Sequence, residues 1–187
     1  MTFLASTTIF TTLGQVFSDL FKFSQAIQYV LDNRGVFLHP QSFDEDSLII
    51  FHALLANPTI EEDSIIKACR LAALLYLKSL TRGMDHLART SKLLADKLKA
   101  ASEGIVPTLI PIPLLLWIFY IGGVATKSTP EQTWFKQKLE NLFVREPELR
   151  DVEGAKAMLE QLLWVDFVHE APLRGLWASC GRGSGNG

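Results

Sequence analysis

The sequence predicts an all-α fold, a multi-helix array of about seven helices around one very apolar central helix. Apolar residues recur at three- and four-residue steps nearly throughout the chain, and hardly any segment shows the alternation of a half-buried strand. With 187 residues, of which 48% are hydrophobic and 20% charged, the chain can bury a core and is too apolar for intrinsic disorder. Residues 104–126 carry no charge and supply the central helix.

The first two helices follow from apolar spacing and from capping residues. A stripe at helical spacing predicts a helix over residues 12–31 and comprises Leu13, Val16, Phe17, Leu20 and Ile27. Ser42 and Glu45 have the spacing of a capping box, in which each side chain binds a free backbone N–H of the first turn. We therefore expect a second helix over residues 42–56, which ends before Pro58 because the residue before a proline avoids helical backbone.

Two more helices precede the uncharged stretch. Thr59 and Glu62 repeat the capping box, and the helix that follows has only one charged residue, Arg70, between residues 68 and 77. Such a helix is expected to be buried on most of its circumference. The next helix, over residues 84–103, has apolar residues on one side and charges on the other, so we expect it at the surface.

Proline positions set the limits of the central helix. Because proline is tolerated in the first turn and costs about 3 kcal/mol in a helix interior, we expect a start at Pro113 and an end near Ala125. A helix of ~13 residues spans about 20 Å, short of the ~30 Å hydrocarbon core of a bilayer. We interpret the segment as a buried helix and keep a small membrane-associated protein that uses residues 109–125 as the alternative.

Two further helices and a tail complete the predicted domain. Pro130 favours a helix start, and Asp151 can cap the helix after it. Pro172 is expected to break the chain and to leave a short closing turn with Leu173, Leu176 and Trp177. We predict one helical domain over residues 1–177, followed by a disordered glycine-rich tail over residues 178–187.

Composition and motifs exclude several classes of protein. Eighteen Lys and Arg residues against twenty Asp and Glu residues give a net charge of -2, with no polybasic segment for nucleic acid. The sequence contains no glycine-rich phosphate loop and no GxSxG nucleophile motif. The histidines lack metal-ligand spacing and are expected at the surface or at helix caps: His39, His52, His86 and His169. We therefore predict no catalytic, cofactor-binding or metal-binding residue and no enzyme.

Two acidic clusters keep one enzymatic alternative open. Residues 44–46 and 61–63 are all Asp or Glu, and helical terpene cyclases bind magnesium diphosphate through such clusters. Both clusters fall in the first turn of a predicted helix, where a carboxylate meets the positive end of the helix dipole. Helix capping is therefore the favoured explanation, and a cyclase would need Asp44 and Glu62 for its magnesium-dependent step.

The cysteines, lysines and tryptophans are assigned to structural roles. Cys69 lies on a buried stripe, whereas Cys180 is expected as a free thiol in the tail, and two cysteines favour a reducing compartment. The basic residues of the fourth helix alternate with acidic ones and predict a solvated face, made by Arg89, Lys92, Lys97 and Lys99. Core or pocket-lining positions are expected for Trp117, Trp134, Trp164 and Trp177.

Five segments carry a distinctive order of hydrophobic and aromatic residues. They are residues 68–77 (ACRLAALLYL), 113–125 (PLLLWIFYIGGVA), 134–135 (WF), 162–166 (LLWVD) and 176–177 (LW). In order and spacing they resemble the carboxyl-terminal part of the fungus-specific transcription factor domain. That domain is the helical regulatory region of fungal binuclear zinc-cluster transcription factors. The resemblance covers about residues 47–177.

The resemblance implies an all-α regulatory module in the nucleus, or otherwise in the cytoplasm, that acts through a protein contact, a small ligand or self-association. The six closely spaced cysteines that hold two zinc ions in such proteins are missing from this sequence. No zinc ligand or DNA-reading residue is therefore carried over, and no direct DNA binding is expected. A pocket is considered where Trp117, Phe119 and Tyr120 meet the third helix, although a filled core is favoured.

Self-association or poor solubility is expected of the isolated chain. If helices of a longer family region normally cover the first and third helices, the apolar faces of these two helices are exposed patches on the order of several hundred Å². Patches of that size favour aggregation or dimerisation. The predicted partner is therefore another protein or a second copy of this chain.

Overall fold

The computed structural model describes residues 2–56, 63–81 and 88–180. Within these ranges the chain forms eight α-helices and no strand, so the all-α prediction is confirmed. The helices are α1 (Thr2–Asp32), α2 (Pro40–Leu55), α3 (Ser64–Leu80), α4 (Ala88–Glu103), α5 (Ile112–Ala125), α6 (Glu131–Arg145), α7 (Val152–Leu159) and α8 (Asp166–Cys180). Two short 3₁₀ helices, η2 (Pro107–Leu109) and η3 (Pro147–Arg150), precede α5 and α7.

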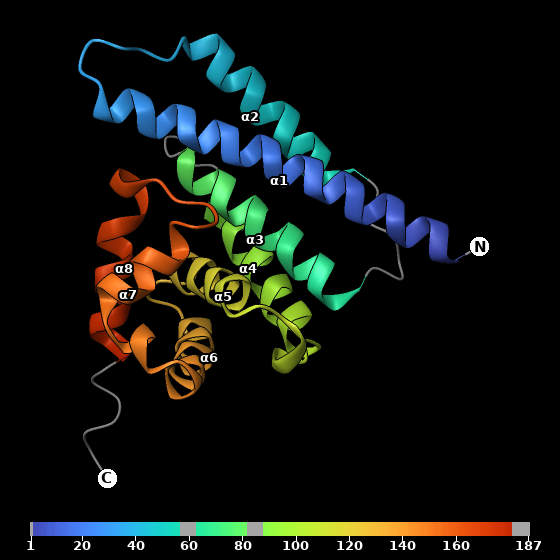
Figure 1. The fold of residues 1–187 in the computed structure, drawn as a ribbon, viewed down its shortest axis with the longest axis vertical. Coiled ribbons are helices and arrows are strands. Elements are labelled where there is room, and N and C mark those ends of the chain that lie inside the picture. Colours follow the sequence, from blue (N-terminus) through green and yellow to red (C-terminus); the bar gives the residue numbers. More distant parts are fainter. Residues whose placement is uncertain (1, 57–62, 82–87, 181–187) are drawn as a thin grey trace.

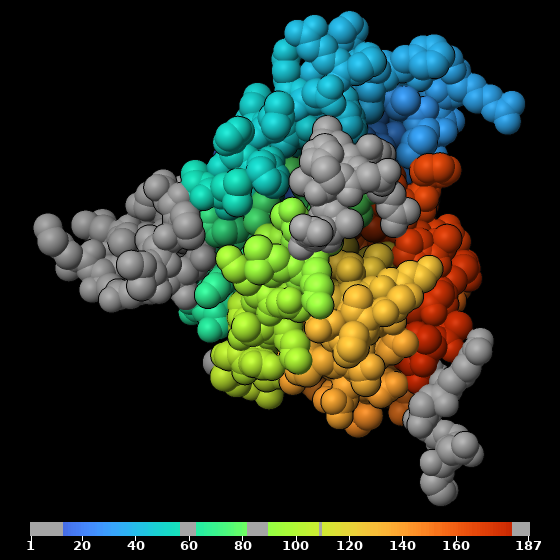
Figure 2. Space-filling model, turned by 180° about the vertical axis from the view of Figure 1, so that it is seen from behind, coloured from blue at the N-terminus to red at the C-terminus, as the bar shows by residue number. Residues whose placement is uncertain are grey.

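The helices pack as a paired layer over a bundle. Helices α1 and α2 lie side by side and cover α3, which in turn packs against α4 and α5 (Figure 1). Helices α6, α7 and α8 close the other side of α5 (Figure 1). Figure 2 shows the opposite face, where residues of α4, in green, lie between those of α2 and those of the carboxyl-terminal helices. Residues far apart in the sequence, in α1 and α8, meet at one end of the bundle.

Helix α5 is enclosed by its neighbours. Every residue from Leu115 to Gly123 is buried, and the helix contacts α3, α4, α6, α7 and α8. It begins at Ile112, one residue before the predicted start, with Pro113 in the first turn where no backbone N–H is needed. Each large apolar side chain that it buries contributes about 1.5–3 kcal/mol. Among the residues that the structure describes, none of the helices combines the length and apolar character that crossing a lipid bilayer requires.

Helix α3 is buried along most of its length, as its lack of charge predicts. Ten of its residues, from Ile66 to Leu77, are buried. The one charged residue between residues 68 and 77, Arg70, also contacts a neighbouring helix. Its guanidinium donates to the carbonyls of Leu54 and Ala56, both at 3.0 Å. A cation there satisfies the free carbonyls at the end of α2. The expectation that α3 exposes an apolar face is therefore wrong.

The helix starts differ from the predicted ones in two places. Helix α1 begins at Thr2 and is longer than predicted at its amino-terminal end. Helix α2 begins at Pro40 with His39 as its N-cap residue, because proline at the first helical position has the backbone angle that a helix start needs. Ser42 is therefore inside the helix. The capping box of Thr59 and Glu62 lies outside the described residues, and the side chain of Asp63 caps α3 by accepting from the N–H of Ile65 at 2.8 Å.

Helix α8 contradicts the predicted break at Pro172. The helix runs through this proline to Cys180, so the predicted tail is wrong for residues 178–180, and residues 181–187 lie outside the described residues. A proline inside a helix costs about 3 kcal/mol, but burial of a large side chain returns about 1.5–3 kcal/mol. Helix α8 buries Leu173, Leu176 and Trp177, and together these offset the proline.

Candidate functional site

His169 lies in the core, and its predicted place at the surface or at a cap is wrong. Only 1% of the residue is exposed. Its ring stacks on that of Tyr76 in α3, with ring centroids 4.9 Å apart and an interplanar angle of 9°. Of the other histidines, His39 is the N-cap residue of α2 and His52 is exposed, as predicted, whereas His86 lies outside the described residues.

Hydrogen bonds define the protonation of His169. The hydroxyl of Ser79 donates to the carbonyl of Tyr76 at 2.6 Å and lies 3.1 Å from His169 Nε2. Because the hydroxyl has one proton and uses it there, Nε2 carries the ring proton and donates to Ser79. With Nε2 protonated, Nδ1 faces the N–H of Val165 at 3.1 Å, and the carbonyl oxygen of Val165 lies 3.0 Å from the same nitrogen. Because the Ser79 proton goes to the Tyr76 carbonyl, this pair lacks the serine-to-histidine hydrogen bond that activates a nucleophile.

Buried hydroxyl groups around this histidine connect two pairs of helices. The hydroxyl of Tyr76 donates to Ser24 Oγ at 2.9 Å, and Ser24 donates to the carbonyl of Leu20 at 2.7 Å. The hydroxyl of Tyr120 donates to the carbonyl of His169 at 2.8 Å. Burial raises the pKa of Tyr76 above its usual range, so this group stays protonated. These bonds join α1 to α3 and α5 to α8, and the stacking of Tyr76 on His169 brings the two pairs together.

A small cavity lies beside the Ser79–His169 pair. Its volume is about 190 Å³, and it is lined by Leu75, Lys78, Ser79, Ser91, Ile121, Val124, Ala125 and His169. Burial lowers the pKa of Lys78 at this wall. The cavity does not reach the place where a pocket was considered. There Trp117, Phe119 and Tyr120 are at most 3% exposed, which fits the favoured alternative, a filled core.

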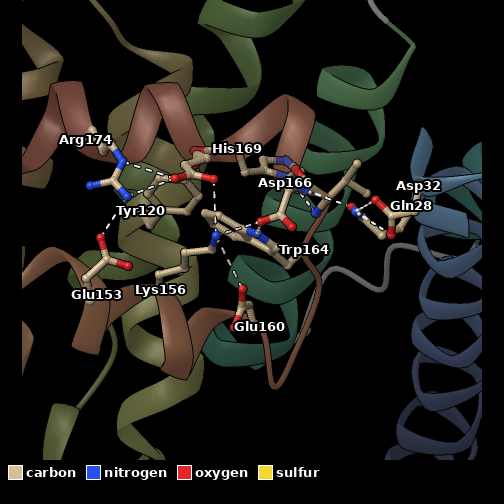
Figure 3. Close-up of polar contacts among 12 residues, drawn as sticks. Gln28, Asp32, Tyr120, Glu153, Lys156, Glu160, Trp164, Asp166, His169 and Arg174 are labelled. Carbon is tan, nitrogen blue, oxygen red and sulfur yellow. Dashed lines mark hydrogen bonds and ion pairs between the residues drawn. The ribbon is translucent and has the colours of Figure 1, made fainter.

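A network of ion pairs holds the start of α8 against α7 (Figure 3). Lys156 Nζ lies 2.9 Å from Asp166 Oδ1 and 3.2 Å from Glu170 Oε2. The indole N–H of Trp164 donates to the same oxygen of Asp166 at 2.8 Å. The hydrogen bond from Trp164, and next that from Lys156, holds the pKa of Asp166 below its ordinary value. The carboxylates in turn raise the pKa of Lys156.

The network extends along α8 and across to α1. Arg174 pairs with Glu170 at 2.9 Å and with Glu153 at 2.7 Å, and these contacts raise the pKa of the guanidinium (Figure 3). Gln28 Oε1, on α1, accepts from the backbone N–H of Asp166 at 2.9 Å. Every described charge in this cluster therefore has a partner of opposite sign, which fits a structural role better than a chemical one.

Most of the exposed large apolar side chains of the described residues lie on α1, α2 and the loop between them. Of thirteen large hydrophobic side chains exposed within the described residues, nine belong to this part of the chain. We call them the α1–α2 surface: Phe21, Tyr29, Leu31, Val36, Phe37, Leu48, Ile49, Phe51 and Leu55. The expectation of an exposed apolar face thus holds for the first helix, and the second helix joins it.

A groove between α1 and α2 adjoins this surface. It has a volume of about 390 Å³ and is lined by Asp19, Lys22, Phe23, Ala26, Leu38, Phe43, Asp46, Ile49 and Ile50. Lys22 and Asp19 pair across 3.4 Å at its rim. The remaining rim charge, Asp46, is acidic. The groove therefore has an apolar floor and a negative edge.

The acidic clusters do not form a metal site within the described residues. Residues 44–46 lie beyond the first turn of α2, because the helix begins at Pro40, so their predicted place at the helix start is wrong. Asp63 does cap α3, as predicted for the second cluster. Glu61 and Glu62 lie outside the described residues. The terpene-cyclase alternative gains no support from this arrangement.

Both cysteines are buried, which corrects the prediction for Cys180. Its place at the end of α8 leaves it 3% exposed, and burial raises its pKa to about 11. Cys69 is buried on α3 as predicted, and burial raises its pKa to about 12. Nucleophilic cysteines are thiolates near neutral pH. Neither thiol fits that role.

The fourth helix and the tryptophans largely follow the predictions. Lys92 and Lys97 are exposed, and the side chain of Arg89 lies outside the described residues. Lys99 departs from the predicted solvated face, because its ammonium lies 5.9 Å from the centre of the Trp134 ring. The other tryptophans are buried, as predicted: Trp117, Trp164 and Trp177.

Comparison with protein families gives a match over residues 17–164 to the family described as the fungal specific transcription factor domain. This chain belongs to that family. The match starts earlier than the predicted resemblance, since it includes the second half of α1 and all of α2, and it ends at Trp164, before α8. No curated protein and no solved structure gives a significant match. The family assigns this fungal-specific transcription factor domain to transcriptional regulation.

Proposed function

We propose that this fungal-specific transcription factor domain regulates transcription by binding a protein partner through the α1–α2 surface. The observation that carries the proposal is that nine of the thirteen exposed large hydrophobic side chains of the described residues lie on α1, α2 and the loop between them. Contiguous exposed apolar surface marks protein contacts in soluble domains. The family match, which includes α2 and the second half of α1, supports the regulatory part of the proposal.

The charge of this region indicates what kind of partner it fits. Residues 1–56 contain five acidic and two basic side chains, and α2 contains no Lys or Arg. The adjoining groove has an apolar floor and the acidic Asp46 at its edge. A partner segment with apolar anchors and Lys or Arg at its rim complements this surface.

We also propose that the chain is not an enzyme, makes no DNA contact of its own and acts in the nucleus. The proton direction in the Ser79–His169 pair and the paired charges around Lys156 support a non-catalytic role. The net charge of -2 supports the absence of a DNA-binding surface. The family supports nuclear action.

A tethered reporter assay tests the proposal. The chain is fused to a foreign DNA-binding module in fungal cells, and transcription from a reporter carrying the matching site is measured. The wild-type chain is expected to change reporter output. The variant Ile49→Ser with Leu55→Ser is expected to lose at least about fivefold of that effect, because truncating a central interface side chain costs on the order of 1 kcal/mol or more.

A matched control uses exposed apolar residues elsewhere. Val144 and Phe167 are 73% and 82% exposed and lie on α6 and α8. The variant Val144→Ser with Phe167→Ser should retain the wild-type effect, and circular dichroism should show equal folding of both variants. Equal loss in both variants, or no loss in either, overturns the proposal. Sedimentation that shows a dimer dissolved by the α2 variant would make this surface a contact between copies and also overturn it.

A further inference from the structure

A second cavity lies on the far side of α5 from the α1–α2 surface. It has a volume of about 510 Å³ and is lined by Val124, Lys127, Ser128, Gln132, Lys136, Ala171, Pro172, Gly175, Leu176 and Ser179. These residues come from the end of α5, the turn after it, the first turns of α6, and α8. Pockets for small molecules have volumes of about 300–1,000 Å³. This cavity falls within that range.

The charged groups of this cavity are both cations. Lys127 is exposed and Lys136 is half-buried, and neither makes an ion pair or a hydrogen bond within the part of the chain that the structure describes. No carboxylate lines the cavity. Glu140, one turn along α6 from Lys136, lies outside the lining, and Glu170 is held by Lys156 and Arg174.

Two lysines that line one cavity without a carboxylate in the lining favour an anion from outside. Two positive charges on one wall raise the local potential, and an anion between them gains from both. The other cations of α7 and α8 already have carboxylate partners, for example Arg174 with Glu153. The electrostatics of the cavity therefore select a negatively charged group near Lys127 and Lys136.

The opposite wall of the cavity is apolar, and a glycine in this wall leaves space in the cavity. Val124, Ala171, Pro172 and Leu176 supply apolar atoms. Gly175 lies inside α8, where glycine costs about 1 kcal/mol relative to alanine, yet nothing lies within 4 Å of a Cβ added there. Packing within the described structure therefore does not require this glycine. Its missing side chain leaves room in the cavity.

We propose that this cavity binds a small organic anion with an apolar body. The anionic group lies between the ammonium groups of Lys127 and Lys136, with the hydroxyls of Ser128 and Ser179 within the same lining. The apolar body lies against Pro172, Gly175 and Leu176. This site is independent of the partner contact proposed at α1 and α2, because it uses no residue of either helix.

The test is an NMR titration of the full chain with two probes of the same length. Hexanoate and 1-hexanol share a six-carbon body and differ in charge. Hexanoate is expected to shift the amide signals of residues 127–136 and 171–179 saturably, with 1-hexanol at least about tenfold weaker because it lacks the charge. Lys136→Gln should weaken hexanoate about tenfold, and Gly175→Leu should abolish saturable binding by filling the space.

A charge-matched control distinguishes binding in the cavity from non-specific attraction of an anion to a positive charge. Lys67 on α3 is exposed and has no described ion pair, so Lys67→Gln removes the same charge elsewhere. This variant should bind hexanoate as the wild type does. Equal affinity for the two probes, unchanged affinity in Lys136→Gln, equal weakening in Lys67→Gln, or shifts confined to α1 and α2 would each overturn the proposal. A negative result in this titration does not affect the proposal for the α1–α2 surface, which the reporter assay tests separately.

Discussion

Gln28 on α1 caps α8 across 138 residues of sequence, because its side-chain oxygen accepts from the backbone N–H of Asp166 at 2.9 Å. The first N–H groups of a helix have no partner inside the helix. The amide nitrogen of Gln28 is fixed at the same time by Asp32, at 3.0 and 3.1 Å from its two carboxylate oxygens. One glutamine therefore joins the exposed helix pair to the ion-pair network of α7 and α8 (Figure 3).

Gln28→Ala should lower the free energy of unfolding by about 1 kcal/mol, because a partly buried backbone donor loses its acceptor. Hydrogen exchange at the amide of Asp166 should become faster. The control is Gln15→Ala, which removes an exposed hydrogen bond to Asp19 within α1 and should cost no more than about 0.5 kcal/mol. Equal effects of the two substitutions would show that the contact with α8 adds no stability.

The buried pair of Ser24 and Tyr76 should respond asymmetrically to substitution. Ser24→Ala leaves the tyrosine hydroxyl as a buried donor without an acceptor, which costs about 1–3 kcal/mol. Tyr76→Phe should cost less, about 1 kcal/mol, because the serine still donates to the carbonyl of Leu20. The double variant should be more stable than the sum of the two single losses predicts, since it leaves no orphaned donor.

Urea unfolding of the wild type, the two single variants and the double variant measures the energetic coupling between the hydroxyl groups of Ser24 and Tyr76. Ser24→Ala alone should have the lowest midpoint of the single variants. A double variant whose loss equals the sum of the single losses would mean that the hydroxyl groups do not interact in the folded state.

The sequence pattern correctly predicted burial for the two helical segments that contain almost no charged residues. Residues 68–77 contain a single charge and residues 104–126 contain none, so these segments had to be covered by other helices. In the structure they are the buried parts of α3 and α5. Pro113 gave the start of α5 to within one residue, because its constraint is local.

The continuous helix α8 was not predicted, because proline disfavours a helix interior locally and only packing against distant residues overcomes this. Pro172 disfavours a helix interior by itself, and its penalty is overcome only by contacts with distant residues, such as that of Trp177 Nε1 with the carbonyl of Leu149 at 2.8 Å. A signal was present in the sequence. His169, Leu173, Leu176 and Cys180 recur at helical spacing on one stripe, which would have placed both His169 and Cys180 in the core.

Of the two proposed binding sites, the sequence predicted the exposed apolar face of the first helix but neither the share of α2 in it nor the second cavity. The α1–α2 surface depends on which sides of two amphipathic helices find neighbours, and spacing alone does not determine this. The second cavity joins Lys136 on α6 to Gly175 on α8, residues that only the fold brings together. In the sequence, Lys136 has only its chain neighbours beside it, so nothing there indicates that it shares a cavity with a glycine of another helix.

Gly122→Ala should destabilise the protein by about 1–3 kcal/mol through overpacking. A Cβ at this position would overlap the ring of Phe135, which is fully buried on α6 and has no space to move away. The control is Gly14→Ala, because nothing lies within 4 Å of a Cβ added there. That substitution should raise stability by about 0.5–1 kcal/mol, as alanine is favoured over glycine in a helix. Thermal unfolding followed by circular dichroism measures both, and an unchanged midpoint in Gly122→Ala would contradict the close approach of α5 and α6.

Asp166→Asn should destabilise the protein at pH 7 by about 0.5–1 kcal/mol, a range set by the partial exposure of the ion pair with Lys156. Asparagine keeps an acceptor for Trp164 Nε1 but loses the charge. Because the folded protein holds the pKa of Asp166 below its ordinary value of 3.8, this stabilisation is present above that value and is lost as the pH falls through the lower folded pKa. The difference between wild type and variant should therefore be constant from pH 7 to about pH 5 and should shrink below about pH 4.

Urea unfolding at a series of pH values measures this difference, with Asp19→Asn as the control. Asp19 pairs with Lys22 at 3.4 Å in an exposed position, and a pair of that kind contributes from nothing to about 1 kcal/mol. Its loss should leave the pH dependence close to that of the wild type, because no buried contact accompanies the charge. If the gap between Asp166→Asn and the wild type instead widened on acidification, the charged form of Asp166 would be the destabilising one, and the ion pairs would not hold the start of α8.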